Sequence, residues 1–279
     1  MIYEINDAPQ RAFLSTFCVP SLTFSPTETL PTALQPIWEA HQTGNPHAAQ
    51  SQARHALDVQ RLFTTEERAA LTIGLAAAEL TLRAGDRAKR LAGQALELFP
   101  MQWSGHRILL SNLAANQSYQ AAYLHLEALD LKGPFPAWDE PMDTFTRALC
   151  LAAWAWQLSE WEAVASHLNT AYPHGIHTMP TPLLQDWFKL SLYRERPEDA
   201  ATVADLLIAE GPVEQTDELL QAIVLNGWTK QALPLYRKAY AKTPQSQLLR
   251  RRLVALCIRE GALDEARLLA APGALTLAA

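Results

Sequence analysis

The stretch NGWTKQALPLYRKAYAKTP, residues 226–244, decides the fold because it contains the end of a first helix, the turn and the second helix of one repeat. Gly227 stands at a turn, where a residue able to adopt positive φ ends a helix at low cost. Ala232 lies early in the helix that follows, where we expect two helices to pass closest. Pro244 ends that helix, since proline cannot continue the hydrogen-bond ladder. The stretch therefore predicts a first helix, a short turn and a second helix.

The same arrangement recurs along the chain, and the small residue early in each second helix, its anchor, marks the period. EGALDEARLLAAP (residues 260–272) and ANQSYQAAYLHLEALDL (residues 115–131) are further copies. The expected anchors are Ala49, Ala88, Ala121, Ala163, Ala200, Ala232 and Ala266. Their spacings are 39, 33, 42, 37, 32 and 34 residues. Insertions in residues 46–65 and in the proline-broken loop at residues 132–141 explain the two longest spacings.

The composition supports a packed helical protein. Hydrophobic residues make up 49% of the 279 residues and charged residues 19%, which is ample for a core. Alanine and leucine dominate over β-branched valine, and this bias favours helices. The formal net charge of −6 does not suit phosphate backbones, so we expect no nucleic-acid partner. The apolar stretches are too short to cross a bilayer as a helix, so we expect no membrane insertion.

Seven helix hairpins are expected, stacked into a single elongated all-α domain over residues 30–270. The first helices are expected near residues 30–42, 65–83, 102–115, 142–157, 183–195, 213–226 and 245–260. The second helices are expected near residues 46–59, 87–98, 118–131, 160–171, 197–210, 229–242 and 263–270.

The chain resembles tetratricopeptide-repeat proteins over roughly residues 30–270. The series that match best are Gly227, Ala232, Tyr236, Ala239 and Pro244, and Gly261, Ala266 and Ala270. Four of the six anchor spacings lie close to the 34-residue period of that family. The resemblance implies a right-handed superhelical solenoid whose first helices line a concave groove. The chain departs from the pattern where Leu158 and Glu195 replace the turn glycine, and where the turn of the second hairpin is about two residues shorter.

The flanking segments differ from the repeats. Residues 1–29 contain AFLSTFCVPSLTFSP, which is aromatic, β-branched and proline-containing, so we expect an extended segment. The start is not that of a secretory signal. Residues 271–279 form a short apolar tail, and Leu268, Leu269, Leu275 and Leu277 need cover. The cover could come from the tail folding back over the last helix, from residues 13–24 of a neighbouring molecule, or from the same end of a second copy. We favour self-association, as a homodimer through the C-terminal end.

The chemistry-bearing motifs searched for are absent: the sequence has no glycine-rich phosphate loop, paired CxxC, HExxH or GxSxG. His174 and His177 could supply half of a zinc site, but no cysteine or carboxylate stands beside them, so a solvated loop is favoured. We therefore expect no enzyme, no cofactor and no metal. The three cysteines are odd in number and far apart, which fits a reducing cytoplasm.

A partner-binding surface is expected on the first helices, where the resemblance places the groove. Aromatic and arginine side chains are over-represented at binding hot spots. The residues expected to contact a partner are Trp38, His41, Trp103, His106, Arg107, Leu110, Phe145, Trp156, Lys189, Tyr193, Arg251 and Arg259, with Gln221 on the same face. The competing interpretation is that some of them fill the interior of a tight superhelix.

These observations favour an interaction scaffold or adaptor that captures a peptide segment of another protein. One alternative is a regulatory sensor that binds a small ligand or signalling peptide. Another is a structural subunit that assembles through its ends. The sequence does not identify the partner, because the fold does not encode it.

Overall fold

The computed structural model describes residues 16–17, 32–136, 138–210 and 212–271. Over these residues the chain has 14 α-helices, short 3₁₀ stretches and no strand. This confirms the all-α prediction. The expected extended segment 1–29 and the tail 271–279 lie outside the described residues, apart from Thr16, Phe17 and Ala271.

The helices alternate in pairs, and their bounds lie within a few residues of those predicted. The first helices of the pairs are α1 (Gln35–Gln42), α3 (Thr65–Thr81), α5 (Trp103–Ala115), α7 (Thr144–Gln157), α9 (Thr181–Tyr193), α11 (Val213–Leu225) and α13 (Gln247–Arg259). The second helices are α2 (Pro46–Asp58), α4 (Gly85–Leu98), α6 (Tyr119–Ala128), α8 (Trp161–Ala171), α10 (Pro197–Glu210), α12 (Thr229–Lys242) and α14 (Leu263–Ala270). The 3₁₀ helices are η3 (Gln60–Leu62) and η4 (Ile176–Thr178).

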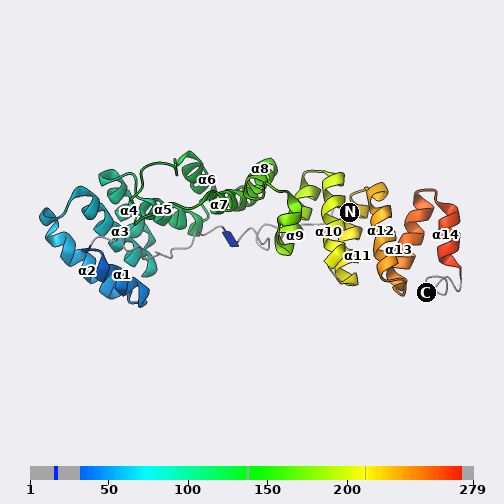
Figure 1. The fold of residues 1–279 in the computed structure, drawn as a ribbon, viewed down its shortest axis with the longest axis horizontal. Coiled ribbons are helices and arrows are strands. Elements are labelled where there is room, and N and C mark those ends of the chain that lie inside the picture. Colours follow the sequence, from blue (N-terminus) through cyan, green and yellow to red (C-terminus); the bar gives the residue numbers. More distant parts are fainter. Residues whose placement is uncertain (1–15, 18–31, 137, 211, 272–279) are drawn as a thin grey trace. The chain divides into compact units, whose positions relative to one another are not determined.

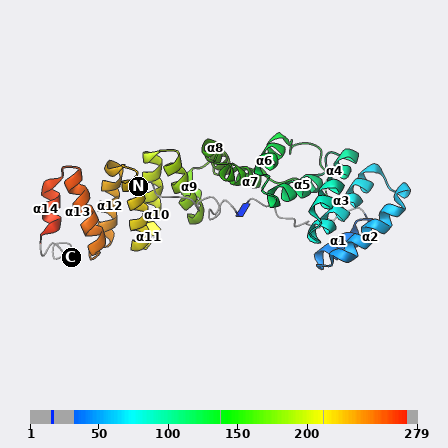
Figure 2. The same ribbon diagram turned by 180° about the vertical axis from the view of Figure 1, so that it is seen from behind.

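The chain divides into two compact units, residues 1–171 and residues 172–279. Within each unit every described helix packs against the next one along the chain (Figure 1; Figure 2 shows the reverse side). First helices also contact first helices, as α1 contacts α3 and α3 contacts α5. This is the packing of neighbouring helix hairpins. The right-handed superhelix and the single domain over residues 30–270 stay predictions.

All seven hairpins share one turn. Three residues separate each first helix from its second helix, and the middle position of the turn has positive φ. The residues in this position are Gly44, Arg83, Gln117, Ser159, Glu195, Gly227 and Gly261. In every turn this residue's N–H donates to the carbonyl three residues back, and the next N–H donates to the carbonyl five residues back. These two bonds define the Schellman motif, which satisfies carbonyls left open at a helix end.

The shared turn corrects two expectations. Leu158 does not take the glycine position, because its φ of −89° and ψ of −3° are helical, and Ser159 takes that position instead. The turn of the second hairpin is not shorter, because Arg83 has a φ of 62° and Gly85 is the first residue of α4. A non-glycine residue with positive φ costs about 1–2 kcal/mol of conformational free energy, so glycine is the usual sequence signal for this position. The turns at Arg83 and Ser159 lack that signal.

The anchor of each second helix stands five residues after the positive-φ position. The residues there are Ala49, Ala88, Ala122, Val164, Ala200, Ala232 and Ala266, and each is at most 4% exposed. Five of the expected anchors are confirmed, but Ala121 is exposed and Ala163 is half-buried. Sequence alone did not distinguish adjacent small residues such as Ala121 and Ala122. The geometry of the turn settles which one faces the first helix.

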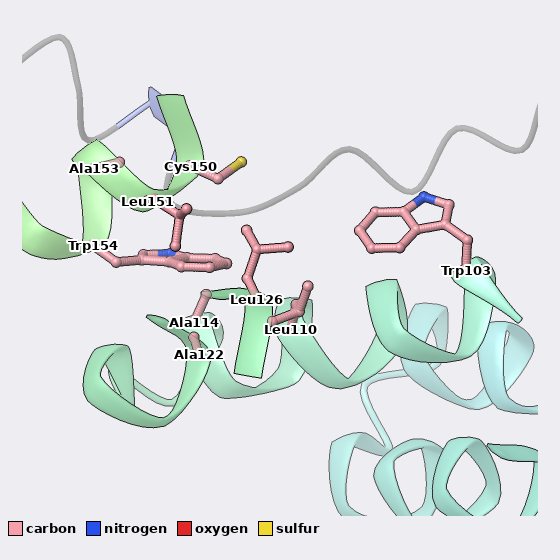
Figure 3. Packing of buried hydrophobic residues seen from close by; sticks show 9 residues of the cluster. All are labelled: Trp103, Leu110, Ala114, Ala122, Leu126, Cys150, Leu151, Ala153 and Trp154. Carbon is pink, nitrogen blue, oxygen red and sulfur yellow. The ribbon is translucent and has the colours of Figure 1, made fainter. Parts of the chain in front are cut away.

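The anchors allow close approach of helices around a bulky core. Figure 3 shows Ala122 of α6 next to Ala114 of α5, with the Trp154 ring from α7 above them. These residues belong to one buried cluster that also contains Leu110 and Leu126. Trp154 is fully buried and Trp187 is 5% exposed, so both are core residues.

The adjacent alanines of α6 provide a test of the register. We expect Ala122→Leu to lower the free energy of unfolding by about 1–3 kcal/mol, because a larger side chain overpacks the contact with α5. Ala121→Leu introduces the same side chain at an exposed position and should change stability by less than about 0.5 kcal/mol. Urea unfolding followed by circular dichroism measures both. Equal destabilisation of the two variants would contradict the register.

Candidate functional site

The twelve candidate partner-binding residues all lie on first helices, as expected, but they differ in accessibility. Eight belong to the unit of residues 1–171 and four to the unit of residues 172–279. Each unit is therefore considered by itself.

Three of the candidates are core residues and not surface residues. Trp103 is 3% exposed, and Leu110 and Trp156 are fully buried. The Trp156 ring packs edge-on against Trp161 of α8, with ring centroids 5.4 Å apart. Their burial leaves these three side chains no surface for a partner in this structure. They are buried because α5 and α7 carry buried residues around most of their circumference. The sequence of such a helix does not show which face is exposed to solvent.

His41 joins two first helices. Its Nε2 lies 3.2 Å from the carbonyl oxygen of Gly74 in α3. A Cβ added at Gly74 would lie 3.0 Å from Cγ2 of Ile37, so glycine is what allows α1 to approach α3 this closely. Burial lowers the pKa of His41. This side chain is half-buried and holds helices together.

His106 forms a hydrogen-bonded pair with His125 of α6. Nε2 of His106 lies 3.0 Å from the carbonyl oxygen of Pro100, so that nitrogen carries the proton and donates. Nδ1 of His106 then holds a lone pair and accepts from Nε2–H of His125 at 3.0 Å. His106 is neutral in this arrangement, because one of its ring nitrogens donates and the other accepts. Burial is the largest cause of the lowered pKa of each ring.

The histidine pair does not form a metal site in this geometry. The ring centroids are 5.2 Å apart while the bonded nitrogens are 3.0 Å apart, so the two nitrogens point at each other and not toward a common third point. His174 and His177 are exposed residues of a turn region. Among the described residues no group of three or more His, Cys, Asp or Glu could hold a metal ion.

Arg107 lies near a buried carboxylate that the sequence search missed. Asp139 is 4% exposed and lies in the connection between α6 and α7. Both of its carboxylate oxygens accept the Ser104 N–H at 3.0 Å, and Oδ1 also accepts the Ser104 hydroxyl at 2.5 Å. Burial raises the pKa of Asp139, while the bonds from Ser104 and the positive charge of Arg107 oppose this shift. Asp139 thus caps α5, whose own N-cap residue Gln102 makes no side-chain cap bond.

Trp138, the residue before Asp139, reaches another first helix. Its Nε1–H donates to Oε1 of Glu66 in α3 at 3.4 Å. Its ring packs against the buried cluster that includes Ile37 and Leu71. The sequence search treated this stretch only as a loop between helices. The available signal was a tryptophan and two acidic residues between prolines, which is unusual for a solvated connection.

The remaining candidates of the first unit are accessible to different degrees. Trp38 is half-buried on α1, and Phe145 is 45% exposed at the start of α7. Phe145 is therefore the most accessible aromatic candidate of this unit.

In the second unit the charged candidates divide into paired and exposed ones. Lys189 forms an ion pair with buried Asp186 at 3.4 Å. Tyr193 is half-buried, and burial raises its pKa. Arg251 and Arg259 are exposed on α13.

A buried polar network lies beside these residues and was missed as a network. The Tyr236 hydroxyl donates to Asp217 at 3.2 Å and accepts from the Gln221 amide at 3.0 Å. Arg252 pairs with Asp217 at 3.9 Å. Arg250 instead donates to the carbonyls of Leu269 and Ala271 at the end of α14. The basic run 250–252 is therefore divided: Arg250 and Arg252 have these partners, and Arg251 and Arg252 are exposed.

No protein-family model matches the chain, and no curated protein matches it. No described helix is long and apolar enough to cross a membrane.

The histidine pair predicts a pH dependence of stability. Because the folded pKa values lie below the ordinary histidine value near 6.5, the unfolded chain takes up protons more readily as the pH falls. The stabilisation from these two histidines is complete above the ordinary histidine pKa and is lost as the pH falls below it. We expect the urea midpoint to fall between pH 7.5 and pH 5.5, and to fall less when His106 and His125 are both replaced by Gln.

The matched control is His55→Gln, which changes an exposed histidine of α2. It should leave the pH dependence as it is in the unchanged chain. An identical dependence for the double variant would show that the pair does not titrate in this range.

Proposed function

We propose that this chain is a non-enzymatic, cytoplasmic interaction scaffold that binds a peptide segment of another protein against its first helices. The observation that supports this most is the turn shared by all seven hairpins, which fixes a regular framework while the exposed side chains differ from one hairpin to the next. A tetratricopeptide-like stacking of hairpins would bring the first-helix side chains within each unit onto one face. The step from such a framework to peptide binding rests on analogy of fold.

Three exposed first-helix residues carry the proposal after the buried candidates are removed. Phe145 offers an aromatic surface on α7, and Arg251 and Arg259 offer positive charge on α13. Aromatic and arginine side chains contribute most to binding energy when a partner covers them. Arginine also binds carboxylates with two parallel hydrogen bonds. The second unit therefore suits an acidic segment.

A selection from a random peptide library on the immobilised chain tests this function. We expect binders whose affinity falls about tenfold or more, about 1.4 kcal/mol, in Phe145→Ala or Arg251→Ala chains. Arg90→Ala is the matched control, because Arg90 is exposed on the second helix α4. Fluorescence anisotropy measures each dissociation constant. A selection that yields no binder, or binders equally sensitive to Arg90→Ala, would overturn the proposal.

Self-association is a second candidate, and the exposed leucines of α14 favour it. Leu263 is 50% exposed and Leu268 is 73% exposed, and α13 is the helix that packs against α14 among the described residues. Exposed apolar side chains on a terminal helix gain from burial against a second copy.

Light scattering across a dilution series tests the dimer. The unchanged chain should dissociate on dilution, and Leu268→Glu should be monomeric at every concentration because it places a charge in the contact. Lys230→Glu, at an exposed position of α12, is the control and should dimerise normally. A strictly monomeric unchanged chain would exclude this candidate.

A further inference from the structure

The loop between α6 and α7, residues 129–143, is longer than the connection requires. It contains 15 residues, whereas the corresponding connection between α10 and α11 contains two and that between α4 and α5 contains four. The prolines at 134, 136 and 141 keep it out of helical structure. Two adjacent side chains of this loop, Trp138 and Asp139, contact first helices of earlier hairpins.

Asp139 fills a carboxylate site built from three kinds of donor. The Ser104 N–H at the start of α5, the Ser104 hydroxyl and the charge of Arg107 all favour an anion at this place. The positive end of the helix dipole adds to them. The carboxylate is buried, so its desolvation is offset by the bonds from Ser104, the backbone N–H of Trp103 and the positive charge of Arg107.

Trp138 fills an aromatic site next to the carboxylate site. Its indole packs against the buried cluster formed by α1, α2 and α3, and Glu66 accepts its N–H. An apolar surface with one acceptor suits tryptophan, which has an apolar body and a single donor. The Asp139 N–H donates to the carbonyl of Pro136 at 2.9 Å, so Trp138 and Asp139 lie in a turn. The two sites together therefore bind two successive side chains of a segment that turns at this place.

One buried group directly before α5, two residues from the carboxylate site at Ser104, is left without a partner within the described part of the chain. Gln102, directly before α5, is fully buried, and neither atom of its side-chain amide has a hydrogen-bond partner among the residues that the structure describes. A buried amide without partners disfavours the arrangement that leaves it so. A different segment at this place could supply a backbone N–H and carbonyl to Gln102.

We propose that this surface recognises a peptide in which an aromatic residue precedes an acidic residue, and that Trp138 and Asp139 occupy it until such a partner displaces them. The inference rests on the proposed function and names the kind of partner that the first unit takes. A tethered occupant competes at high effective concentration, so it lowers the apparent affinity of a partner and restricts binding to segments that fit better.

A peptide with the sequence of residues 132–141, KGPFPAWDEP, tests the proposal when it carries a fluorescent label. In the full chain with Trp138→Ala and Asp139→Ala, the two sites are vacated. We expect this variant to bind the peptide at least tenfold more tightly than the unchanged chain does. A peptide with Ala at both positions should bind neither chain. The proposal is overturned if the folded double variant does not bind the loop peptide, or if it binds the loop peptide and the alanine-substituted peptide equally.

Hydrogen–deuterium exchange of the unchanged chain is a second test, which does not require the double variant to fold. Saturating peptide should accelerate exchange in residues 129–136 and 138–143, because it displaces the loop from α3 and α5. Unchanged exchange would overturn the proposal. Adding Ser104→Ala and Arg107→Ala to the double variant should abolish its peptide binding, and retained binding would place the peptide elsewhere.

The outcome is separable from that of the proposed function. One result would be selected library peptides that depend on Arg251 but bind the unchanged chain and the Trp138→Ala, Asp139→Ala variant equally well. That result would support the scaffold function and contradict this inference. Binding of the loop peptide alone, with no library binder sensitive to Phe145 or Arg251, would support the inference and contradict the wider surface.

Discussion

Two backbone hydrogen bonds at each turn hold the architecture in place. They force one residue into positive φ, end the first helix, and place the next residue at the N-cap of the second helix. The buried anchor then follows five residues later in every hairpin. Four of the seven positive-φ residues are not glycine, so the packed helices on either side must stabilise a backbone conformation that side chains disfavour. Turn geometry and helix packing therefore support each other.

The sequence predicted the helices well because their signals are local. Helical periodicity, proline at helix ends and glycine at turns such as Gly227 depend on residues close in the chain. The same signals failed where the deciding residue has no distinctive chemistry. Ser159 adopts positive φ although serine has no special preference for that conformation. Ala122 is the anchor, but its neighbour Ala121 is also an alanine, so residue type does not distinguish the two. Both positions follow from the turn once its hydrogen bonds are known.

The candidate site was predicted less well because accessibility depends on distant segments. Trp156 is buried against Trp161 of the next helix, and Trp103 lies in a cluster to which α6 and α7 also contribute. Near Arg107 lies the buried carboxylate of Asp139, which is 32 residues away in the chain. The periodicity of a first helix does not show whether segments distant in the chain bury its side chains. What periodicity did identify correctly is the set of helices on which the accessible residues lie.

The contrast between the two kinds of connection has a consequence for how this chain tolerates change in length. Every turn inside a hairpin contains three residues, whereas the connections between hairpins range from two residues to 15. Added residues inside a hairpin would break the two hydrogen bonds and rotate the anchor away from its neighbour. Added residues between hairpins leave both undisturbed. Epitope tags, reporter domains and new binding loops thus belong between hairpins, where the chain already carries its own insertion at residues 129–143.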